Sequence, residues 1–485
     1  MKIVLFSTPV MDYEQGTLRP IGYDASRECP PYGVYLLATI LIRHGYEVVV
    51  ADLIAEGTNT IAKFSDDLGS CTLVGISATT LSWPTATEVI SQLRESAPRV
   101  PIVIGGVHPT MFAEYIMQSF PVDYVICGEA EKSFPMLCEA ITRRTGFENI
   151  PSLVWRSDDG GLISNPRMPR LTTDEISRSP IPDYSILPKG AYKGLSIESS
   201  RGCCFDCSFC SATYRGKWVP FEPNRFVDNI ERVVRYLDDT KLKLLYIIDD
   251  EFSFDPARCI EIANELRNRG LCPRLTYDSR VNDLVHDGLL ESISEFTHQI
   301  LVGAECGYVE GLVKIGKGTT TARIEKAASI LAKHGLASKT DFSFIIGLPW
   351  ETRNEVSKTL TFAAHLLADY GVRLLLQWYV QMPGSRLWME NRRRQVVHGA
   401  MYDRYGFFRN LYLFRTANQL LPSEIWEISR AIESSKVLSR LRYPEKQMIE
   451  HSLPLQIYEN FPVKGLELMN VNWTPLNEKK QRKEA

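Results

Sequence analysis

Short apolar runs alternate with longer amphipathic stretches over the first 140 residues of the chain. A run that is apolar at every position predicts a buried strand, and apolar residues three or four positions apart predict a helix. By this pattern strands are expected at 2–7, 47–51, 73–77, 101–104 and 122–127, and helices at 32–44 and 86–95. Fully apolar strands that alternate with helices are typical of a parallel sheet covered on both faces. Residues 1–142 are therefore predicted to form one α/β domain.

A second alternating series begins near residue 193. Its strands are expected at 195–198, 242–248, 274–277, 299–302, 339–346 and 372–380, with helices at 226–237, 255–268, 321–334 and 355–370. About six such units predict a full or partial (β/α) barrel over residues 193–384, whose working face is the carboxyl end of the strands. Residues 143–192 are rich in Pro, Ser, Asp and Gly, which predicts a linker with a small hairpin.

The last hundred residues, 385–485, are predicted to be mainly helical. They include an aromatic cluster from Tyr402 to Phe414 and a charged tail over the last ten positions. We expect the tail to be a solvated end, because chain termini usually fray.

Composition narrows the functional classes. The 485 residues carry a net charge of −3, so no overall basic field indicates a nucleic-acid partner. No run of about 18 apolar residues occurs, so no membrane span is expected. The opening segment has no cleavage site of a signal peptide, and the 11 cysteines are odd in number and unevenly spaced. Both features favour a cytoplasmic, reducing location without a disulfide framework.

Three cysteines on one loop form the main chemical candidate. Cys203, Cys207 and Cys210 are spaced C-x3-C-x2-C directly after a predicted strand. Thiolates in this number suit an iron–sulfur cluster or zinc. Structural zinc takes four ligands, usually in two pairs, and no second pair follows. Three protein ligands to a four-iron cubane would leave one iron without a protein ligand, and Cys204 would then be a spare thiol. The third alternative is that the cysteines are grouped here by chance. The seven scattered cysteines are interpreted as small buried residues or idle thiols.

The C-x3-C-x2-C loop, with aromatic Phe209 before the last cysteine, resembles that of radical S-adenosylmethionine enzymes. The resemblance implies a [4Fe-4S] cluster whose open iron chelates S-adenosylmethionine. It also implies that one electron, supplied by an external flavodoxin- or ferredoxin-type donor, cleaves this cofactor to a 5′-deoxyadenosyl radical. In such an arrangement Phe209 would pack near the adenine.

Further segments agree with this resemblance. They are Asp249-Asp250-Glu251, GAECG at 303–307 and IIGLP at 345–349. The resemblance implies that Asp249, Arg280, Glu305 and Gly347 bind S-adenosylmethionine. A carboxylate needs a cation and an ammonium needs an acceptor, which suits Arg280 and Glu305. The alternative for these two is an ion-paired charge in the barrel, and for Gly347 a backbone turn.

The first domain resembles the Rossmann-like (flavodoxin-like) cobalamin-binding domain that precedes the radical domain in one class of these enzymes. The matching segments are GISATT, IGGVHPT and CGEAE, and they assign to cobalamin the residues Ser77, Gly105, Gly106, His108, Gly128 and Glu129. The Asp-x-His-x-x-Gly motif that supplies a cobalt ligand elsewhere is absent, as is common in this class. A domain with the fold but without cobalamin, and a His108 that only caps a helix, are the alternatives.

The resemblance implies a cobalamin-dependent radical methyltransferase acting on an unactivated carbon, or a phosphinate phosphorus, of a small molecule in secondary-metabolite, cofactor or lipid biosynthesis. Cyclisation or rearrangement with the same cofactors is the first alternative. A methylthiotransferase would need a second cluster, with Cys29, Cys71 and Cys127 as its possible ligands. A non-enzymatic iron–sulfur or zinc binding module is the last. The sequence names no substrate.

Overall fold

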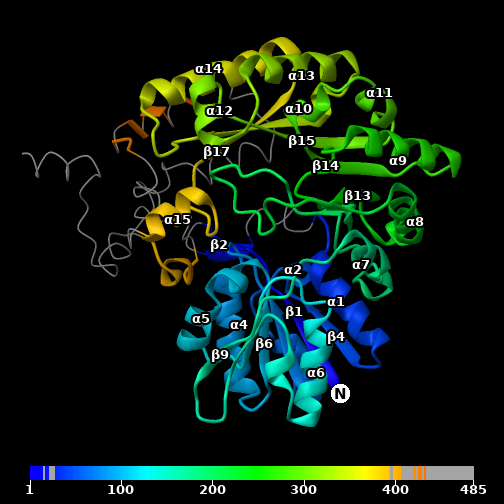
Figure 1. Cartoon of the computed structure of the whole chain (residues 1–485), viewed down its shortest axis with the longest axis vertical. Helices are drawn as coiled ribbons and strands as arrows, with labels where there is room; N and C mark the ends of the chain where they lie inside the picture. The colour runs from blue at the N-terminus through cyan, green and yellow to red at the C-terminus, as the bar shows by residue number, and fades with distance from the viewer. Residues whose placement is uncertain are drawn as a thin grey trace, which may run out of the picture. The chain divides into compact units, whose positions relative to one another are not determined.

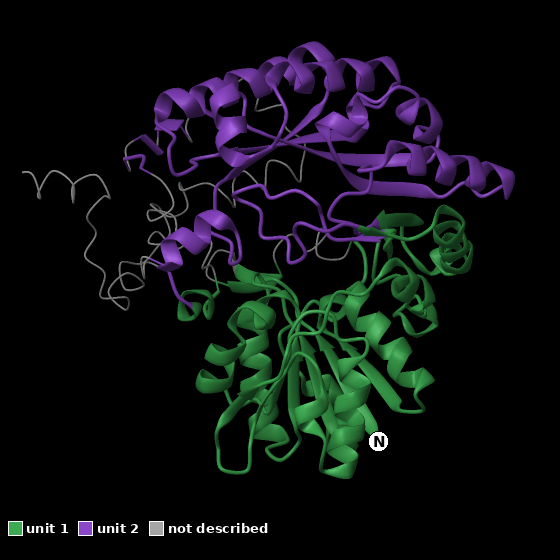
Figure 2. Ribbon diagram, viewed as in Figure 1, with its two compact units in different colours: residues 1–199, 219–246, 399–406 green, residues 200–218, 247–398, 407–485 purple. Residues whose placement is uncertain are grey.

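The structure is a computed structural model that describes residues 1–14, 17–20, 28–393, 397–405, 419–421, 424–425, 427–428 and 431–432. It contains two compact units (Figure 2). Unit 1 comprises Met1–Ser199, Val219–Tyr246 and Gly399–Gly406, and unit 2 comprises Ser200–Trp218, Ile247–His398 and Phe407–Ala485. The described parts of both units combine strands and helices (Figure 1).

The first sheet has seven strands in the order β4-β1-β5-β6-β7-β8-β9. The first five in this order pair in parallel, and the last two strands pair antiparallel as a hairpin. The strands are β1 (Lys2–Ser7), β4 (Glu47–Asp52), β5 (Leu73–Ser77), β6 (Ile102–Gly105), β7 (Tyr124–Ile126), β8 (Leu153–Arg156) and β9 (Leu162–Ser164). Parallel pairing brings the carboxyl ends of β1, β5, β6 and β7 to one edge of the sheet.

Helices cover this sheet because their apolar positions recur at helical spacing. On α1 (Tyr32–Arg43) the side chains of Val34, Ala38 and Leu41 join the strand residues Ile3 and Leu73 in one core. The other elements assigned to unit 1 are β2 (Met11–Glu14), β3 (Thr17–Pro20), α2 (Leu53–Glu56), α3 (Ser65–Ser70), α4 (Trp83–Ser96), α5 (Val107–Ser119), α6 (Ser133–Arg143), α7 (Thr173–Arg178), β12 (Val219–Pro220) and α8 (Pro223–Val234), with short 3-10 turns at Ala62–Phe64, Phe147–Asn149, Tyr184–Ile186, Leu237–Asp239 and Gly399–Tyr402.

A segment from late in the chain completes unit 1. Tyr402 is fully buried, and Asp403 accepts hydrogen bonds from the indole of Trp83 (2.8 Å) and the hydroxyl of Tyr115. At Gly399 a β-carbon would lie 2.6 Å from the ring of Tyr115, so only glycine allows this close approach. Residues 399–405 are therefore part of the packing of unit 1, although they follow unit 2 in sequence.

The second sheet has six strands in the order β10-β13-β14-β15-β16-β17. The strands are β10 (Gly194–Ile197), β13 (Leu244–Ile247), β14 (Arg274–Arg280), β15 (Thr297–Glu305), β16 (Thr340–Ile346) and β17 (Arg373–Trp378), and the last four pair in parallel. The remaining elements are β11 (Ser200–Arg201), α9 (Pro256–Asn268), α10 (Val281–Leu284), α11 (Leu289–Ile293), α12 (Val309–Ile315), α13 (Thr321–Lys333), a 3-10 turn at Ala337–Lys339, α14 (Arg353–Tyr370) and α15 (Arg386–Arg393). Two mainly parallel sheets combined with helices confirm the predicted α/β fold class.

Two strands are longer than their sequence pattern predicts. β14 ends at Arg280 and β15 at Glu305, so these candidates are the last residues of their strands and do not lie in loops beyond them. The strand ends lack an apolar run, since β14 ends in Asp278-Ser279-Arg280 and β15 in Gly303-Ala304-Glu305, and the register of β15 shifts between Gly303 and Glu305. The hairpin β2–β3 and the helices of four to seven residues were also missed, because such short elements show no periodicity.

Much of the predicted helical region from 385 to 485 lies outside the described residues. The part of it that the structure describes includes α15 and the turn Gly399–Tyr402. The aromatic cluster beyond Tyr405 and the charged tail both fall outside. Among the described residues, no helix has the length and apolar character needed to cross a membrane.

Candidate cluster and cofactor sites

The three candidate cysteines lie on a loop that the backbone holds at several points. The amide of Cys203 donates to the carbonyl of Tyr214 (3.0 Å), and the amide of Cys210 donates to that of Cys207 (3.1 Å), closing a turn. Cys207 is buried, and Cys203 and Cys210 are partly buried. Burial raises the pKa of Cys203 to about 11 and also raises that of Cys210, so iron would have to displace protons on binding.

Arg280 connects the end of β14 to this loop. One guanidinium nitrogen lies 3.8 Å from the Sγ of Cys207, and the other donates to the carbonyl of Lys317. The guanidinium carbon also lies 3.4 Å from the ring centroid of Phe205, a cation–π contact within the loop. Sequence reasoning singled out Arg280, but not the aromatic residue that holds it.

Glu305 forms a buried ion pair with Lys317, a residue that the sequence analysis missed. The two charged atoms are 2.9 Å apart, and both side chains are only 8% exposed. Glu305 has a positive φ of 69°, a strained conformation for a residue with a β-carbon. A β-carbon at Gly303 would come within 2.4 Å of the Glu305 carboxylate and 2.5 Å of the Lys317 ammonium. Gly303 therefore leaves the space that the pair occupies.

Lys317 keeps its charge in this setting. Burial acts to lower its pKa, but the negative charges of the Glu305 carboxylate and of a Cys207 thiolate outweigh burial, so the pKa is raised. In the sequence, Lys317 stands between two glycines, Gly316 and Gly318, and this pattern was the signal that could have marked it. Both glycines have positive φ in the structure.

A second group of buried acidic residues follows the strands β13 and β14, at the carboxyl ends of the strands. Glu251 accepts hydrogen bonds from the hydroxyl of Ser253 (2.8 Å) and the amide of Arg280 (3.3 Å), and the same hydroxyl lies 3.3 Å from Asp283. Burial, and then the Asp283 carboxylate, raise the pKa of Glu251 to about 8, while burial also raises that of Asp283. Two carboxyls placed this way share one proton near neutral pH.

Replacing Glu251 by Gln is expected to remove a pH dependence of stability. A carboxyl with a higher pKa in the folded state stabilises that state when protonated, so its contribution is complete below about pH 4.5 and is lost as the pH rises through about 8. Between about pH 5 and 8 the wild-type free energy of unfolding should fall by at least about 1.4 kcal/mol, the value of one pKa unit. Denaturant titrations at both pH values measure this. Glu261→Gln on the exposed side of α9 is the control, and an equal slope in Glu251→Gln would contradict the expectation.

The other candidates in unit 2 fall into two kinds. Asp249 is buried and accepts a hydrogen bond from the hydroxyl of Ser200 (2.6 Å). Gly347 has φ of 76°, and a β-carbon there would lie 2.6 Å from the indole of Trp378, so its role is to allow close packing. Phe209 is partly buried within the cysteine loop. Asp249 thus has a fixed side chain beside the loop, whereas Gly347 shapes the backbone.

The donor set of the loop fits an iron–sulfur cluster. Arg280 lies beside the thiol of Cys207, and the amide of Ala212 lies 3.3 Å from the Sγ of Cys210. N–H groups and cations of this kind stabilise thiolate ligands. Among the described residues, no three His, Cys, Asp or Glu side chains are close enough to share a single ion.

The candidates for cobalamin lie at the carboxyl edge of the first sheet. Ser77 ends β5, and Gly105 ends β6 beside it in register. Gly106 has φ of 105°, and a β-carbon there would lie 2.5 Å from the carbonyl of Ala78, so this crossing of two chains requires glycine. The amide of Gly128 donates to the hydroxyl of Thr110 (2.8 Å). At Gly105 a β-carbon would meet only ordinary contacts.

His108 lies inside unit 1 and not on its surface. Its ring is fully buried and stacks on Trp83, with centroids 4.6 Å apart, while Phe112 packs on it at 4.7 Å. The Nδ1 atom is 3.4 Å from the hydroxyl of Thr80, and Nε2 has no hydrogen-bond partner. Burial lowers the pKa of His108 to about 3, so the ring is neutral. These surroundings are those of a core aromatic residue.

His108→Phe is therefore expected to leave the absorption spectrum of bound cobalamin unchanged, because no cobalt ligand is removed. The stability should change by less than about 1.5 kcal/mol, since shape is nearly kept. His108→Ala is the contrasting variant, and the cavity it opens should cost about 2–5 kcal/mol. Absorbance spectra and denaturant melts of both proteins test this, and an altered cobalt spectrum in His108→Phe would overturn it.

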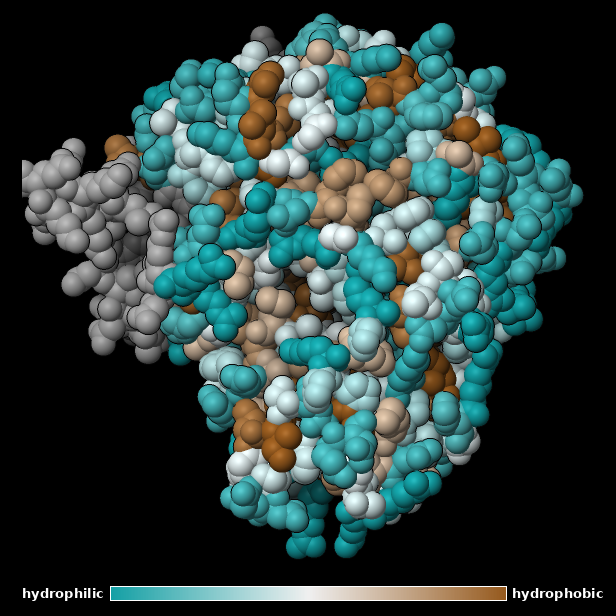
Figure 3. Space-filling model, viewed as in Figure 1, coloured by the Kyte–Doolittle hydropathy of each residue, from teal (hydrophilic) through white to brown (hydrophobic). Residues whose placement is uncertain are grey.

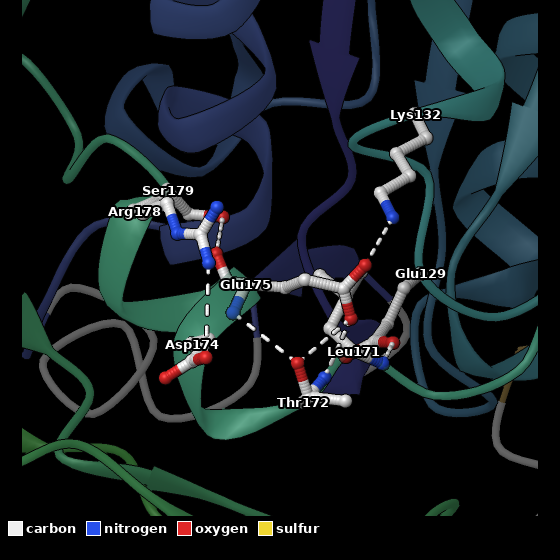
Figure 4. Close-up of polar contacts among 8 residues, drawn as sticks. All are labelled: Glu129, Lys132, Leu171, Thr172, Asp174, Glu175, Arg178 and Ser179. Carbon is white, nitrogen blue, oxygen red and sulfur yellow. Dashed lines mark hydrogen bonds and ion pairs between the residues drawn. The ribbon is translucent and has the colours of Figure 1, made fainter.

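Glu129 holds the segment that follows the first sheet (Figure 4). Its carboxylate accepts a hydrogen bond from the amide of Leu171 (3.0 Å), directly before the capping box with which Thr172 and Glu175 begin α7. Lys132 pairs with Glu175 at 2.5 Å and holds the pKa of that carboxyl at about 2. The carboxylate of Glu129 thus contacts the segment that follows β9, and the assignment of this residue to cobalamin remains a prediction.

Comparison with known proteins gives these sites a family. Residues 19–137 match the B12 binding domain, and residues 197–363 match the Radical SAM superfamily. An uncharacterised methyltransferase of Pyrococcus horikoshii is 31% identical over 403 residues, which cover 80% of this chain and 82% of that protein. The chain belongs to the radical SAM enzymes that carry a B12-binding domain. The first match covers the edge with Ser77 and Gly106, and the second covers the cysteine loop.

More distant relatives agree with this membership. The anaerobic magnesium-protoporphyrin IX monomethyl ester cyclase of Rubrivivax gelatinosus is 27% identical, over 83% of this chain and 72% of its own. Among solved structures, the cobalamin-dependent S-adenosylmethionine radical enzyme OxsB has a TM-score of 0.67 at 15% identity, covering 93% of this chain and 70% of that one. The radical S-adenosylmethionine methyltransferase TsrM of Kitasatospora setae has a TM-score of 0.63 at 18% identity, covering 81% and 76%. At these identities the structures show the fold.

Membership confirms the three predicted cofactors of this radical SAM enzyme: a [4Fe-4S] cluster, S-adenosylmethionine and cobalamin. The residues that hold them remain predictions. The alternative second cluster is not supported by the geometry. Cys71 precedes β5 and Cys127 follows β7, so the two lie at opposite ends of parallel strands, separated by about 20 Å along the strands at about 3.3 Å per residue. They cannot ligate one cluster without unfolding the sheet.

Proposed function

We propose that this radical SAM enzyme is a cobalamin-dependent methyltransferase that methylates an unactivated carbon, or a phosphinate phosphorus, of a small molecule. The observation that carries the proposal is the 31% identity to a methyltransferase over four-fifths of both chains, together with the two matched domains. When bound, the cluster, S-adenosylmethionine and cobalamin supply radical formation and a methyl donor.

The residues of the chain have few acid–base tasks in such a reaction. Cys203, Cys207 and Cys210 would hold the cluster, and Arg280 would stabilise it through Cys207. Glu305, fixed by Lys317 and strained at its backbone, is suited to orient the amino group of S-adenosylmethionine, because a carboxylate accepts from an ammonium. Burial of these charges keeps water from the reacting groups.

The assignment of cobalamin to unit 1 rests on the backbone shape at the sheet edge more than on side chains that could ligate cobalt. Gly106 and Gly128 adopt positive φ at the carboxyl edge of β6 and β7, where ligands of open parallel sheets bind. With His108 inside the core, the described part of unit 1 near this edge offers backbone and hydroxyl groups to the cofactor. Ser77 and Thr110 are the hydroxyl side chains that the candidate segments place there.

The experiment uses anaerobically purified and reconstituted enzyme with hydroxocobalamin, a strong reductant and S-adenosylmethionine. Bound cobalamin, 5′-deoxyadenosine and S-adenosylhomocysteine are quantified. Bound cobalamin with both products supports the methyltransferase. If the enzyme has an intact cluster but forms neither product, the result would contradict radical chemistry and favour a binding module.

A second candidate is cyclisation or another rearrangement without methyl transfer. The identity to magnesium-protoporphyrin ester cyclases over most of the chain favours it. This reading expects 5′-deoxyadenosine without S-adenosylhomocysteine in the same assay. The product formed from a substrate distinguishes methyl transfer from cyclisation. Candidate substrates are therefore added to the reaction once the cluster and cobalamin are bound.

A further inference from the structure

The cysteine loop approaches the surface at one defined place, the end of helix α12. The amide of Ser208 donates to the carbonyl of Ile315 (2.9 Å), and the thiol of Cys207 lies 3.9 Å from the carbonyl of Gly316. Gly316 itself is exposed, and a β-carbon there would have only Arg386 and Asp206 within 4 Å. A predicted cluster ligand is therefore one backbone residue beneath the surface at this point.

The outer side of α12 carries an apolar ridge. Val313 is 72% exposed, the highest value among the exposed large apolar side chains in the described part of the chain. Val309, one helical turn earlier, is 47% exposed. Figure 3 shows apolar surface over α12. A single exposed apolar residue is ordinary, but two at i and i+4 form a continuous strip on a helix. Val313 lies about 5 Å along the helix from Gly316, at 1.5 Å per residue.

Positive charge surrounds this ridge. Lys314 has no carboxylate within ion-pair distance among the described residues, and its ammonium lies 5.5 Å from the ring of Trp350. Arg215 and Arg386 share one carboxylate, that of Asp206. Together, the segments 203–217, 309–315 and 386–393 contain six Lys or Arg and three Asp or Glu, in a chain whose net charge is −3. The local excess of cations fits an acidic partner.

We propose that this α12 surface, formed by Val309, Val313, Lys314, Gly316 and Arg386, docks an acidic one-electron carrier protein of the flavodoxin or ferredoxin type. The carrier loses one electron and the cluster gains it, with no bond made or broken and no proton moved. Electron transfer weakens steeply with distance, so the partner must sit where the ligand is closest to the surface. A small apolar ridge with a charged rim suits the small interfaces of such transient complexes. The proposal requires the cluster of the proposed function, but not methyl transfer.

The test uses anaerobic holoenzyme and a reduced bacterial flavodoxin as the probe. The double variant Val313→Glu/Lys314→Glu adds negative charge at exposed positions, so folding should not be affected. We expect its Kd for flavodoxin to rise at least tenfold, and cluster reduction by flavodoxin, followed by loss of visible absorbance, to slow to a similar extent. Reduction by dithionite, which needs no docking surface, should proceed at the wild-type rate.

Met136→Glu is the control for an added carboxylate, because it places one negative charge on an exposed apolar residue of α6 in unit 1. It should behave as wild type in both assays. A double variant with unchanged flavodoxin affinity and reduction rate would overturn the proposal. Equal slowing with dithionite would do so too, because it would show a damaged cluster and not a lost partner. Neither readout depends on any methylated product.

Discussion

Replacing Cys207 by Ala is expected to abolish both the iron–sulfur cluster and the cleavage of S-adenosylmethionine. Cys207 is the buried cysteine of the three, and it is the one that Arg280 and Gly316 contact. Two remaining thiolates do not hold a four-iron cluster that uses three protein ligands. Iron and sulfide per chain should fall to background, and 5′-deoxyadenosine should be undetectable after reconstitution.

Cys204 provides the control within the same loop. Its side chain is exposed, and three other thiols already satisfy the motif. Cys204→Ala should therefore bind iron and cleave S-adenosylmethionine as wild type does. Loss of the cluster in this variant, or a full complement of iron in Cys207→Ala, would show that the ligand set has been wrongly assigned. Cys203→Ala and Cys210→Ala should match Cys207→Ala.

Lys317→Met is expected to destabilise the protein by about 3–5 kcal/mol, the cost of leaving a buried charge without its partner. Lys317 and Glu305 are equally buried, and the Glu305 backbone is already strained. Denaturant titration of the variant measures the loss. Binding of S-adenosylmethionine should weaken as well, because Glu305 then lacks the contact that fixes its carboxylate.

The double variant Lys317→Met/Glu305→Gln separates an unpaired charge from lost packing. It removes both charges, so it should regain much of the stability. For comparison, Lys63 pairs with Glu56 at the surface, and its side chain is 65% exposed. Lys63→Met should cost less than about 1 kcal/mol. A Lys317→Met protein no less stable than Lys63→Met would contradict the role given to the buried pair.

The fold was predictable because its strands are apolar at nearly every position. Residues 2–7 and 73–77 form β1 and β5 with the expected bounds. Prediction failed where the strand pattern became polar, at Asp278 to Arg280 and at Gly303 to Glu305. There polar residues and a glycine follow the apolar run, so hydrophobic periodicity does not mark the strand ends. The late segment at 399–405 was missed because its partners, Trp83 and Tyr115, are distant in sequence.

The candidate site was predictable only where residues cluster along the chain. Cys203, Cys207 and Cys210 are neighbours on one loop, so their spacing is visible in the sequence. Lys317, the partner of Glu305, is twelve positions away, and Arg280, whose amide donates to Glu251, is 29 positions from it. Such contacts depend on which strands lie side by side. His108 stands in a matching motif, but its ring is buried among aromatic rings, and its assignment to cobalamin remains a prediction.

The place of Asp403 in unit 1 has a consequence for folding during synthesis on the ribosome. A ribosome that has released the first two hundred residues has made the whole first sheet, but not the side chain that receives Trp83 and Tyr115. At about 5–20 residues per second, the segment that covers these aromatic groups follows tens of seconds later, if emergence alone sets the delay. During that time Trp83 and Tyr115 lack their acceptor and Phe112 lacks its contact with Tyr402, so we expect the nascent domain to need protection by chaperones. Expression of the first domain alone should meet the same problem permanently, and adding residues 397–405 as a separate peptide offers a remedy.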